Sequence, residues 1–310
     1  MKRMCVQVCL LLMLAAIPAG AQQVNDEAFK FTNTRPSYAA SKGPVVCVDE
    51  AHSNFHTADG RYKGFADVVR SDGFEVRGSN EKFTAQSLAK CRVIVIANAG
   101  GSDGELWAYP HDSAFTRDEI NAMFLWIRGG GSLLLIADHA PMAGAAAGLA
   151  AMLGAVMADG YANTNSGKPL PDIFSAANGL LKPHAILRGR DGDAAIDSVG
   201  TFTGSAFQVS KEFSPMLVLP AETVVVVRWV MNFEENAPPN SEWPRIPAGG
   251  WLQGASRELG KGRVVLLGEA AMCSAQLAGA EKRPMGMNHP QAPQNAQFCL
   301  NTVRWLAGVI

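Results

Sequence analysis

Four apolar runs, each with a polar or acidic residue within two positions of its end, constrain the fold more than any other feature of this chain. They lie at Val45–Asp49, Arg92–Ala97, Ser132–Asp138 and Arg263–Leu267. A run as continuously apolar as Ser132–Asp138 is typical of a strand buried on both faces of a parallel sheet. Segments with helical periodicity separate the first three runs, which predicts parallel pairing with right-handed crossovers. We therefore predict an α/β fold with a mostly parallel sheet and helices on both faces.

The two ends and the middle of the chain differ from these regular segments. Residues 1–21 are typical of a secretory signal peptide, with two basic residues before an apolar stretch and small residues before a cleavage point. Residues 22–43 are predicted to be an irregular lead-in, and 44–310 a single α/β domain with an irregular, β-containing insertion at about 160–250. We expect an exported protein, periplasmic or extracellular, without a stable membrane anchor after cleavage.

Composition narrows the possible partners and the redox chemistry. The formal net charge is −1, and no basic stripe points to nucleic acid, so we expect no nucleic-acid partner. Four cysteines follow the signal segment, and export makes disulfides possible. Cys273 and Cys299 are expected to pair, since both fall on predicted C-terminal helices, one near Met272–Leu277 and one that starts around Gln294. Cys47 and Cys91 fall in or next to apolar strands and are expected to be buried free thiols.

Acid–base and metal-ligating side chains are concentrated in the loop after the first apolar run. Asp49, Glu50, His52, Asn54 and His56 leave the same strand end within one short loop. Packing alone requires no such concentration, and open α/β sheets bind ligands at the carboxyl ends of their strands. We predict that this loop forms one wall of a polar site.

The other predicted strands end in groups that would reach the same edge of the sheet. Asn98 follows one strand, Asp138 and His139 follow the next, and Glu269 follows the last. A helix is predicted to begin near Pro141, and its first N–H groups favour an anion. Four strand ends are thus expected to build one site.

The order of elements and several motifs resemble the class I glutamine amidotransferase-like superfamily. Gly130–Ser132 precedes the central strand, and Gly262–Glu269 forms a late strand of the same pattern. The chain is similar to a group of secreted bacterial proteins lacking the catalytic Cys, through its Asp49–His52 loop, its Ala137–Pro141 turn and its Asn295–Leu306 segment. The resemblance implies a flavodoxin-like (glutamine amidotransferase-like) sheet more firmly than it implies a reaction.

The chain departs from that superfamily where a glutamine-hydrolysing enzyme holds its nucleophile. Asp138 and His139 occupy the turn that would carry the Cys, and the late strand brings Glu269 without the His-x-Glu pair. Cys-dependent glutamine amidotransfer is therefore not expected.

Two functions remain open for this edge of the sheet. The first is a metal-assisted hydrolase of amide or ester bonds, in which a divalent metal such as zinc activates water. Its metal ligands would be His52, His56 and His139, and its catalytic residues Asp138, Glu269 and His139. The alternative is a non-catalytic domain that binds a small molecule, such as a carbohydrate or another envelope component. The predicted ligand-binding residues are Asp49, Glu50, Asn54 and Asn98.

Each of these residues also has a purely structural interpretation. Acids that follow strands often cap the next turn through backbone N–H groups, as Asp49 and Asp138 could. His56 could brace its loop, and His139 could bond a backbone carbonyl in the core. Glu269 is harder to explain in this way, because a carboxylate that leaves a buried strand needs a partner.

Overall fold

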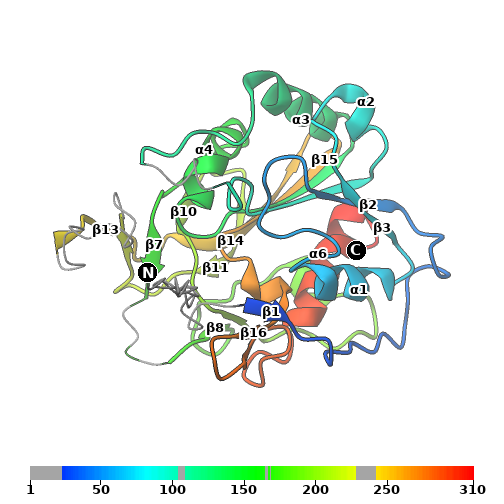
Figure 1. Ribbon diagram of the computed structural model, residues 1–310. Helices are drawn as coiled ribbons and strands as arrows, with labels where there is room; N and C mark the ends of the chain where they lie inside the picture. Colours follow the sequence, from blue (N-terminus) through cyan, green and yellow to red (C-terminus); the bar gives the residue numbers. More distant parts are fainter. Residues whose placement is uncertain (1–22, 104–108, 165–166, 168, 228–241) are drawn as a thin grey trace, which may run out of the picture.

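A nine-stranded sheet forms the centre of the protein, as seen in this computed structural model (Figure 1). The structure describes residues 23–103, 109–164, 167, 169–227 and 242–310. The predicted signal peptide, residues 1–21, lies outside the described residues. No helix in the described part of the chain is long and apolar enough to cross a membrane.

Five neighbouring strands of the sheet run parallel. Across the sheet they are β3 (Glu75–Ser79), β2 (Val45–Asp49), β4 (Val93–Ala97), β5 (Ser132–Ile136) and β15 (Gly262–Leu267). Their carboxyl ends therefore meet at one edge. The prediction of an α/β fold with a large, mostly parallel sheet and helices is confirmed.

Antiparallel strands extend the sheet beyond β15. A hairpin joins β15 to β14 (Leu252–Leu259), with Leu259 paired to Gly262. A Cβ on Gly262 would lie 1.9 Å from the Gly131 carbonyl oxygen, so only glycine fits there. The remaining strands of the sheet are β10 (Phe207–Val209), β6 (Ala155–Met157) and β11 (Ser214–Val218).

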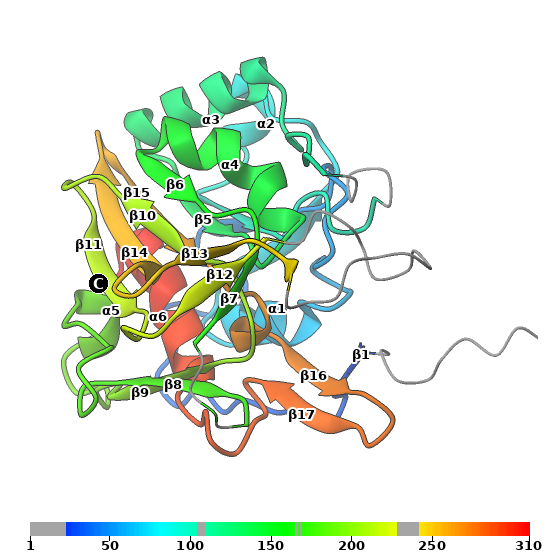
Figure 2. The ribbon, with the colours of Figure 1, turned by 90° about the vertical axis from the view of Figure 1, so that its left-hand side faces the viewer.

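Helices cover both faces of the sheet, because successive side chains of its central strands point to opposite sides. Leu133 and Leu135 of β5 pack on one side, while Leu134 and Ile136 pack on the other. The first side is covered by α2 (Ala85–Leu88), α3 (Arg117–Gly129) and α4 (Met142–Met152), and the second by α1 (Lys63–Arg70) and α6 (Asn295–Ala307) (Figure 2). All central side chains are therefore buried, which explains the unbroken apolar run.

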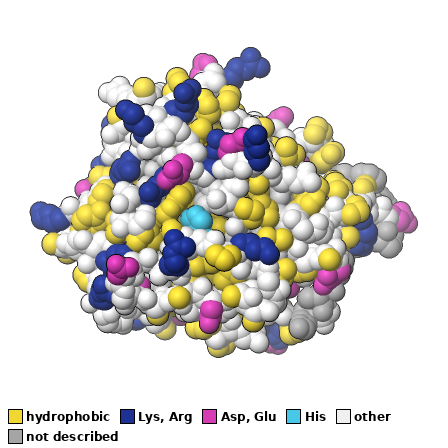
Figure 3. All heavy atoms as spheres, turned by 180° about the vertical axis from the view of Figure 1, so that it is seen from behind, with side chains coloured by type: hydrophobic (Ala, Val, Ile, Leu, Met, Phe, Trp, Pro, Cys, Tyr) yellow, Lys and Arg dark blue, Asp and Glu magenta, His cyan; other side chains and the backbone are white. Residues whose placement is uncertain are grey.

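Short sheets and turns surround this core. One small sheet combines β1 (Gln23–Asn25), β16 (Ala275–Ala278) and β17 (Arg283–Gly286). The segment from about 160 to 250 also contributes β7 (Tyr161–Asn163), β8 (Asp172–Ser175), α5 (Ala185–Arg188), β9 (Ser198–Thr201), β12 (Val224–Val226) and β13 (Arg245–Pro247). On the face shown in Figure 3, basic and acidic side chains are intermingled with apolar ones.

The segment after β15 differs from its sequence prediction. A helix was expected near Met272–Leu277, but a single 3-10 turn, η4 (Ala271–Cys273), leads into β16. The Glu269 carboxylate accepts the Ala271 and Met272 N–H groups at 2.8 and 2.7 Å, which stabilises that turn. The next residues pair on both sides with β1 and β17, so strand hydrogen bonds replace helical ones.

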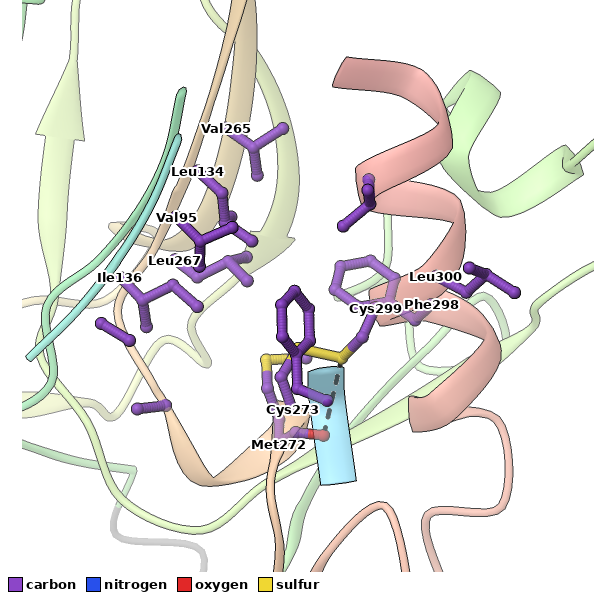
Figure 4. Close-up of a cluster of buried hydrophobic side chains, with 14 of the residues drawn as sticks. Val95, Leu134, Ile136, Val265, Leu267, Met272, Cys273, Phe298, Cys299 and Leu300 are labelled. Atoms are coloured by element: carbon purple, nitrogen blue, oxygen red, sulfur yellow. Dashed lines mark hydrogen bonds between the residues drawn. A yellow bond between two sulfur atoms is a disulfide. The ribbon is translucent and has the colours of Figure 1, made fainter. Parts of the chain in front are cut away.

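Two disulfides join core segments. The predicted Cys273–Cys299 bond is confirmed, and it attaches η4 to α6 beneath the sheet residues Val95 and Leu134 (Figure 4). The expectation of free thiols at Cys47 and Cys91 is wrong, because these two residues form a second disulfide. Burial next to a strand is equally compatible with a free thiol and with a disulfide-bonded cysteine. The register of β2 beside β4 brings Cys47 close to the residues just before β4.

Candidate functional site

The His52 ring lies in the core and is held between two carboxylates. Its Nδ1 is 2.9 Å from both Asp49 carboxylate oxygens, and its Nε2 is 2.9 Å from Glu119 Oε1. Phe83 and Phe115 pack against the ring, with centroids 4.5 and 4.7 Å away. Both ring nitrogens are already bonded, so His52 has no free atom for a metal or a ligand.

Glu119 serves both the His52 contact and the start of α3. The Thr116 hydroxyl accepts from the Glu119 N–H, and the Glu119 carboxylate accepts from the Thr116 N–H at 3.0 Å, which completes a capping box. Burial alone would raise the pKa of Glu119. Hydrogen bonds from His52 and Thr116 outweigh that effect and lower the pKa to about 2. The ionised carboxylate therefore connects the loop after β2 to the helix.

Three other residues of the loop after β2 also make internal bonds. The Asn54 side chain accepts from the His52 N–H and donates to Asp49 at 3.0 Å. Glu50 accepts from the Ala58 N–H at 2.9 Å. Asp49, Glu50 and Asn54 thus brace the loop, and none of the three lines the cavity described next.

A cavity of about 260 Å³ opens at the carboxyl edge of the parallel strands. It brings together Asn98, which follows β4, and Asp138 and His139, which follow β5. Its lining is completed by Gln23, Phe55, His56, Arg61, Met142, Thr203, Ala271, Gln276 and Met285. Other cavities, of about 180 and 390 Å³, contain none of the strand-end residues. The 260 Å³ cavity is therefore the candidate site.

Asp138 is held in a fixed position at this edge. Its backbone N–H donates to the Asn98 side chain at 2.9 Å, and its Oδ1 accepts from the His139 N–H at 2.8 Å. The Thr203 hydroxyl and the Ala270 N–H lie 3.4 Å from its carboxylate oxygens. Asn98 adopts a left-handed backbone conformation with φ of 56°, which aims its short polar side chain at β5. The carboxylate thus keeps capacity to accept from a ligand.

Glu269 is fully buried next to Asp138 and does not line the cavity. Burial, and then the negative charge of Asp138, raise the pKa of Glu269 well above its ordinary value, although three backbone N–H groups oppose the shift. Tyr62 donates to the Ala270 carbonyl at 2.9 Å, and burial and both carboxylates raise its pKa. The two acids form an interacting pair in which Asp138 meets the cavity.

His56 and His139 both line the cavity but differ in their bonding. His139 Nδ1 lies 2.7 Å from the Ala140 carbonyl, and its ring stacks on Tyr161 at 4.2 Å between centroids. His56 is buried against Tyr62, and its Nδ1 has no hydrogen-bond partner among the residues that the structure describes. Burial, and then the nearby Arg61 charge, lower the pKa of His56 to about 3. His56 is therefore neutral near pH 7.

The three histidines predicted as metal ligands do not share one site. His52 is enclosed by its carboxylates, while His56 and His139 line the cavity. Within the described residues, no group of three or more His, Cys, Asp or Glu side chains is placed to hold a metal ion. We therefore assign no metal ligands.

Sequence reasoning missed several residues of the cavity. Arg61 and Thr203 stand in irregular loops, and Gln276 was assigned to a helix rather than to β16. None of them belongs to a motif or follows a strand of the parallel sheet. The capping-box pattern of Thr116 and Glu119 is visible in the sequence, but it does not indicate the contact between Glu119 and His52.

Comparison with known proteins shows the fold alone. No family model and no curated protein matches the chain. The mmIFT52 N-terminal domain superposes with a TM-score of 0.59 at 13% identity, covering 84% of this chain and 97% of that domain. A putative ThuA-like protein from Bacteroides uniformis has a TM-score of 0.46 at 13% identity, covering 89% of this chain and 94% of that one. A cytoplasmic protein from Salmonella typhimurium LT2 has a TM-score of 0.47 at 13% identity, covering 84% and 98%.

These findings correct the family assignment made from the sequence. The chain is not placed in the class I glutamine amidotransferase-like superfamily, or in the secreted group within it, because no family model matches it and the likeness to solved structures is at 13% identity. The motifs behind that assignment have general structural causes. Gly130 ends α3 with φ of 123°, Gly131 leaves room for the Trp126 ring, and Gly262 lets its backbone approach that of Gly131 closely. Any chain with this strand packing needs glycine at such positions.

Proposed function

We propose that the protein binds a small, hydroxyl-bearing molecule, such as a monosaccharide unit, in the cavity at the carboxyl edge. The observation that carries this proposal is that Asn98 and Asp138 follow adjacent parallel strands and line one cavity with Phe55 and Met142. A few fixed polar groups beside an apolar wall are typical of small-molecule sites. Asp138 accepts from ligand hydroxyls, and Thr203 both donates and accepts.

The size of the cavity supports a ligand of about one sugar ring. Its volume of about 260 Å³ is just below the ~300–1,000 Å³ typical of sites for drug-sized molecules. The wall also contains Gln276, whose Oε1 is buried without a hydrogen-bond partner. A ligand hydroxyl that donated to this oxygen would remove the cost of leaving it unpaired.

Replacing Asp138 with Asn tests the binding proposal. We expect the dissociation constants for hydroxylated ligands to rise roughly 10- to 100-fold, because a hydrogen bond to a charged acceptor contributes ~1.5–3 kcal/mol. Calorimetric titration of wild type and Asp138→Asn with neutral hexoses and sugar acids measures the change. Asp67→Asn, in a half-exposed side chain on α1, is the matched control and should leave binding unchanged. Equal affinities for wild type and Asp138→Asn would contradict the proposal.

Hydrolysis of amide or ester bonds is the second candidate function. It is supported by the interaction of Asp138 with Glu269, whose raised pKa favours the protonated form. Pairs of carboxyl groups with separated pKa values supply the acid and the base of many hydrolases. In this function Asp138 meets the substrate as the base, and the protonated Glu269 adds no second negative charge beside it.

Turnover assays with both carboxyl variants test this second function. Asp138→Asn is expected to lower kcat/KM for chromogenic esters or anilides by about 100-fold or more, the usual contribution of a general base. Glu269→Gln should shift the pH profile of kcat/KM, since the interacting group is removed. Glu281→Gln, at an exposed position, is the control and should change neither quantity. A wild-type protein that turns over none of these substrates rules hydrolysis of these bonds out.

We further infer a flavodoxin-like type for the parallel part of the sheet. The order β3-β2-β4-β5-β15 corresponds to second, first, third, fourth and fifth strand along the chain, which is the flavodoxin-like order. In that order the sheet reverses direction of winding between β2 and β4, and ligands bind at such a switch point. Asn98, at the end of β4, lies at this point and lines the cavity.

We also propose that the protein is exported to the periplasm or the extracellular space. The two disulfides support this location, because structural disulfides form and persist in oxidising compartments. The signal-like pattern of residues 1–21 agrees with it. Fractionation of cells producing the full chain, with N-terminal sequencing of the product, tests both export and cleavage.

A further inference from the structure

The Arg61 guanidinium lines the candidate cavity without any counter-charge. Its central carbon lies 3.7 Å from the centroid of the Phe55 ring, which holds the group in place by a cation–π contact. Arg61 makes no hydrogen bond or ion pair with any residue that the structure describes. Arg304, by contrast, is buried and paired with both Asp72 and Asp193. Arg61 is thus a partly buried, uncompensated cation at a polar site.

Leaving such a charge unpaired costs free energy, because burial removes part of its hydration. Burial lowers the pKa of Arg61, but an arginine stays charged at neutral pH. The adjacent His56 is neutral, so it supplies neither a counter-charge nor a second cation. The cavity therefore has one positive group, Arg61, and one negative side chain on its wall, Asp138, which do not pair with each other.

We propose that the ligand carries a single carboxylate that binds Arg61, so that the substrate class is a sugar acid or a related hydroxy acid. This inference rests on the proposed binding function and specifies its ligand. The carboxylate lies at Arg61 in a bidentate contact, for which the planar guanidinium is suited. The hydroxyl groups of the same molecule lie at Asn98, Asp138 and Thr203. His56 Nδ1, buried and unpartnered, is available to a further oxygen of the ligand.

The charge balance of the cavity favours a carboxylate over a phosphate. One guanidinium neutralises one negative charge, and Asp138 already contributes another to the same wall. A phosphate monoester, with a charge of about −1.5 to −2 near pH 7, would leave an excess negative charge in a partly buried space. A carboxylate carries a single negative charge, which the Arg61 guanidinium neutralises.

Calorimetric titrations with matched sugars test the proposal on the full chain. D-glucuronate and D-galacturonate are compared with D-glucose and D-galactose, and D-glucose 6-phosphate is a third probe. We expect wild type to bind each uronate at least about 10-fold more tightly than its hexose, from one charge-assisted contact. Arg61→Gln should weaken uronate binding about 10- to 100-fold and hexose binding much less, so that the preference for uronate over hexose is lost. Arg61→Lys should retain part of the preference, and Arg283→Gln, an exposed control, all of it.

The outcomes separate this inference from the binding proposal. Equal affinity of wild type for hexoses and uronates overturns the inference and leaves the proposed function in place. Tighter binding of the sugar phosphate overturns the assignment of a carboxylate. If wild type binds none of the five probes, both the inference and the binding proposal are overturned. If Arg61→Gln does not fold, the salt dependence of wild type decides, because added salt weakens a charge-assisted contact. Uronate and hexose affinities that fell equally with salt would contradict the inference.

Discussion

Replacement of Arg304 by methionine is expected to lower the free energy of unfolding by about 3–5 kcal/mol, the usual cost of breaking a buried ion pair from one side. Arg304 is 1% exposed. Its Nε donates to Asp72 at 2.9 Å and its Nη1 to Asp193 at 3.2 Å. Methionine fills much of the same space but leaves the buried Asp72 carboxylate without its cation.

The structural reason for so large an effect is that Asp72 joins three segments. Its carboxylate also accepts from Ser37 and Asn33 in the irregular lead-in, while Arg304 belongs to α6. Burial raises the pKa of Asp72, but the hydrogen bonds from Arg304, Ser37 and Asn33 outweigh this and lower it. Loss of Arg304 therefore loosens the lead-in, the turn after α1 and the last helix together.

Chemical denaturation at pH 7 under oxidising conditions measures this change. Arg283→Met is the matched control, since that side chain is 78% exposed, and it should change the free energy of unfolding by less than about 0.5 kcal/mol. The double variant Asp72→Asn/Arg304→Met should lose less than the sum of the two single variants, because neither charge remains alone. A loss below about 1 kcal/mol in Arg304→Met would show that the pair is not a major source of stability.

The second large effect concerns His56 and acid pH. The folded-state pKa of His56 is about 3, well below the ordinary value of 6.5, because the ring is buried beside Arg61. Between these two values the unfolded chain binds a proton that the folded protein does not. Stability from this group is therefore complete above about pH 6.5 and is lost as the pH falls towards 3. One pKa unit corresponds to ~1.4 kcal/mol, so the loss reaches several kcal/mol.

His56→Phe removes the titrating group and preserves packing against Tyr62. We expect the difference in unfolding free energy between wild type and the variant to shift by several kcal/mol in favour of the variant between pH 7 and pH 4. Urea denaturation at a series of pH values follows this difference. His289→Gln, at a less buried histidine, should show a much smaller shift. A difference independent of pH would mean that His56 is solvated in the folded state.

Much of the sheet could be predicted because local sequence and tertiary position agree there. Each of Val93–Ala97 and Leu133–Ile136 is buried on both faces, so every residue had to be apolar and the runs were easy to recognise. The capping box at Thr116 and Glu119 was predictable because its four residues interact locally. The strand that follows Met272 could not be predicted in this way, because β16 depends on pairing with β1, which lies about 250 residues away.

The candidate site was predictable only in part, because some of its contacts join segments that are distant in the sequence. Asn98, Asp138 and His139 meet in the cavity because parallel strands bring their carboxyl ends together, and that rule requires no knowledge of side-chain packing. His52 follows the same rule but is turned into the core by Asp49 and Glu119. One of its two partners, Glu119, lies on a helix 67 residues further along the chain, which no local pattern reveals.

The sequence by itself determined the parallel sheet and the edge at which polar groups collect, because burial and strand order impose residue types at those positions. Only the tertiary structure decided which polar side chains face the cavity and which are hydrogen-bonded to other residues inside the protein. That choice depends on hydrogen bonds between distant segments, as at His52, and on the absence of one with any described residue, as at Arg61. Most buried polar groups bond to a partner within reach. Among the buried atoms left without one in the described part of the chain, His56 Nδ1 and Gln276 Oε1 belong to residues that line the cavity.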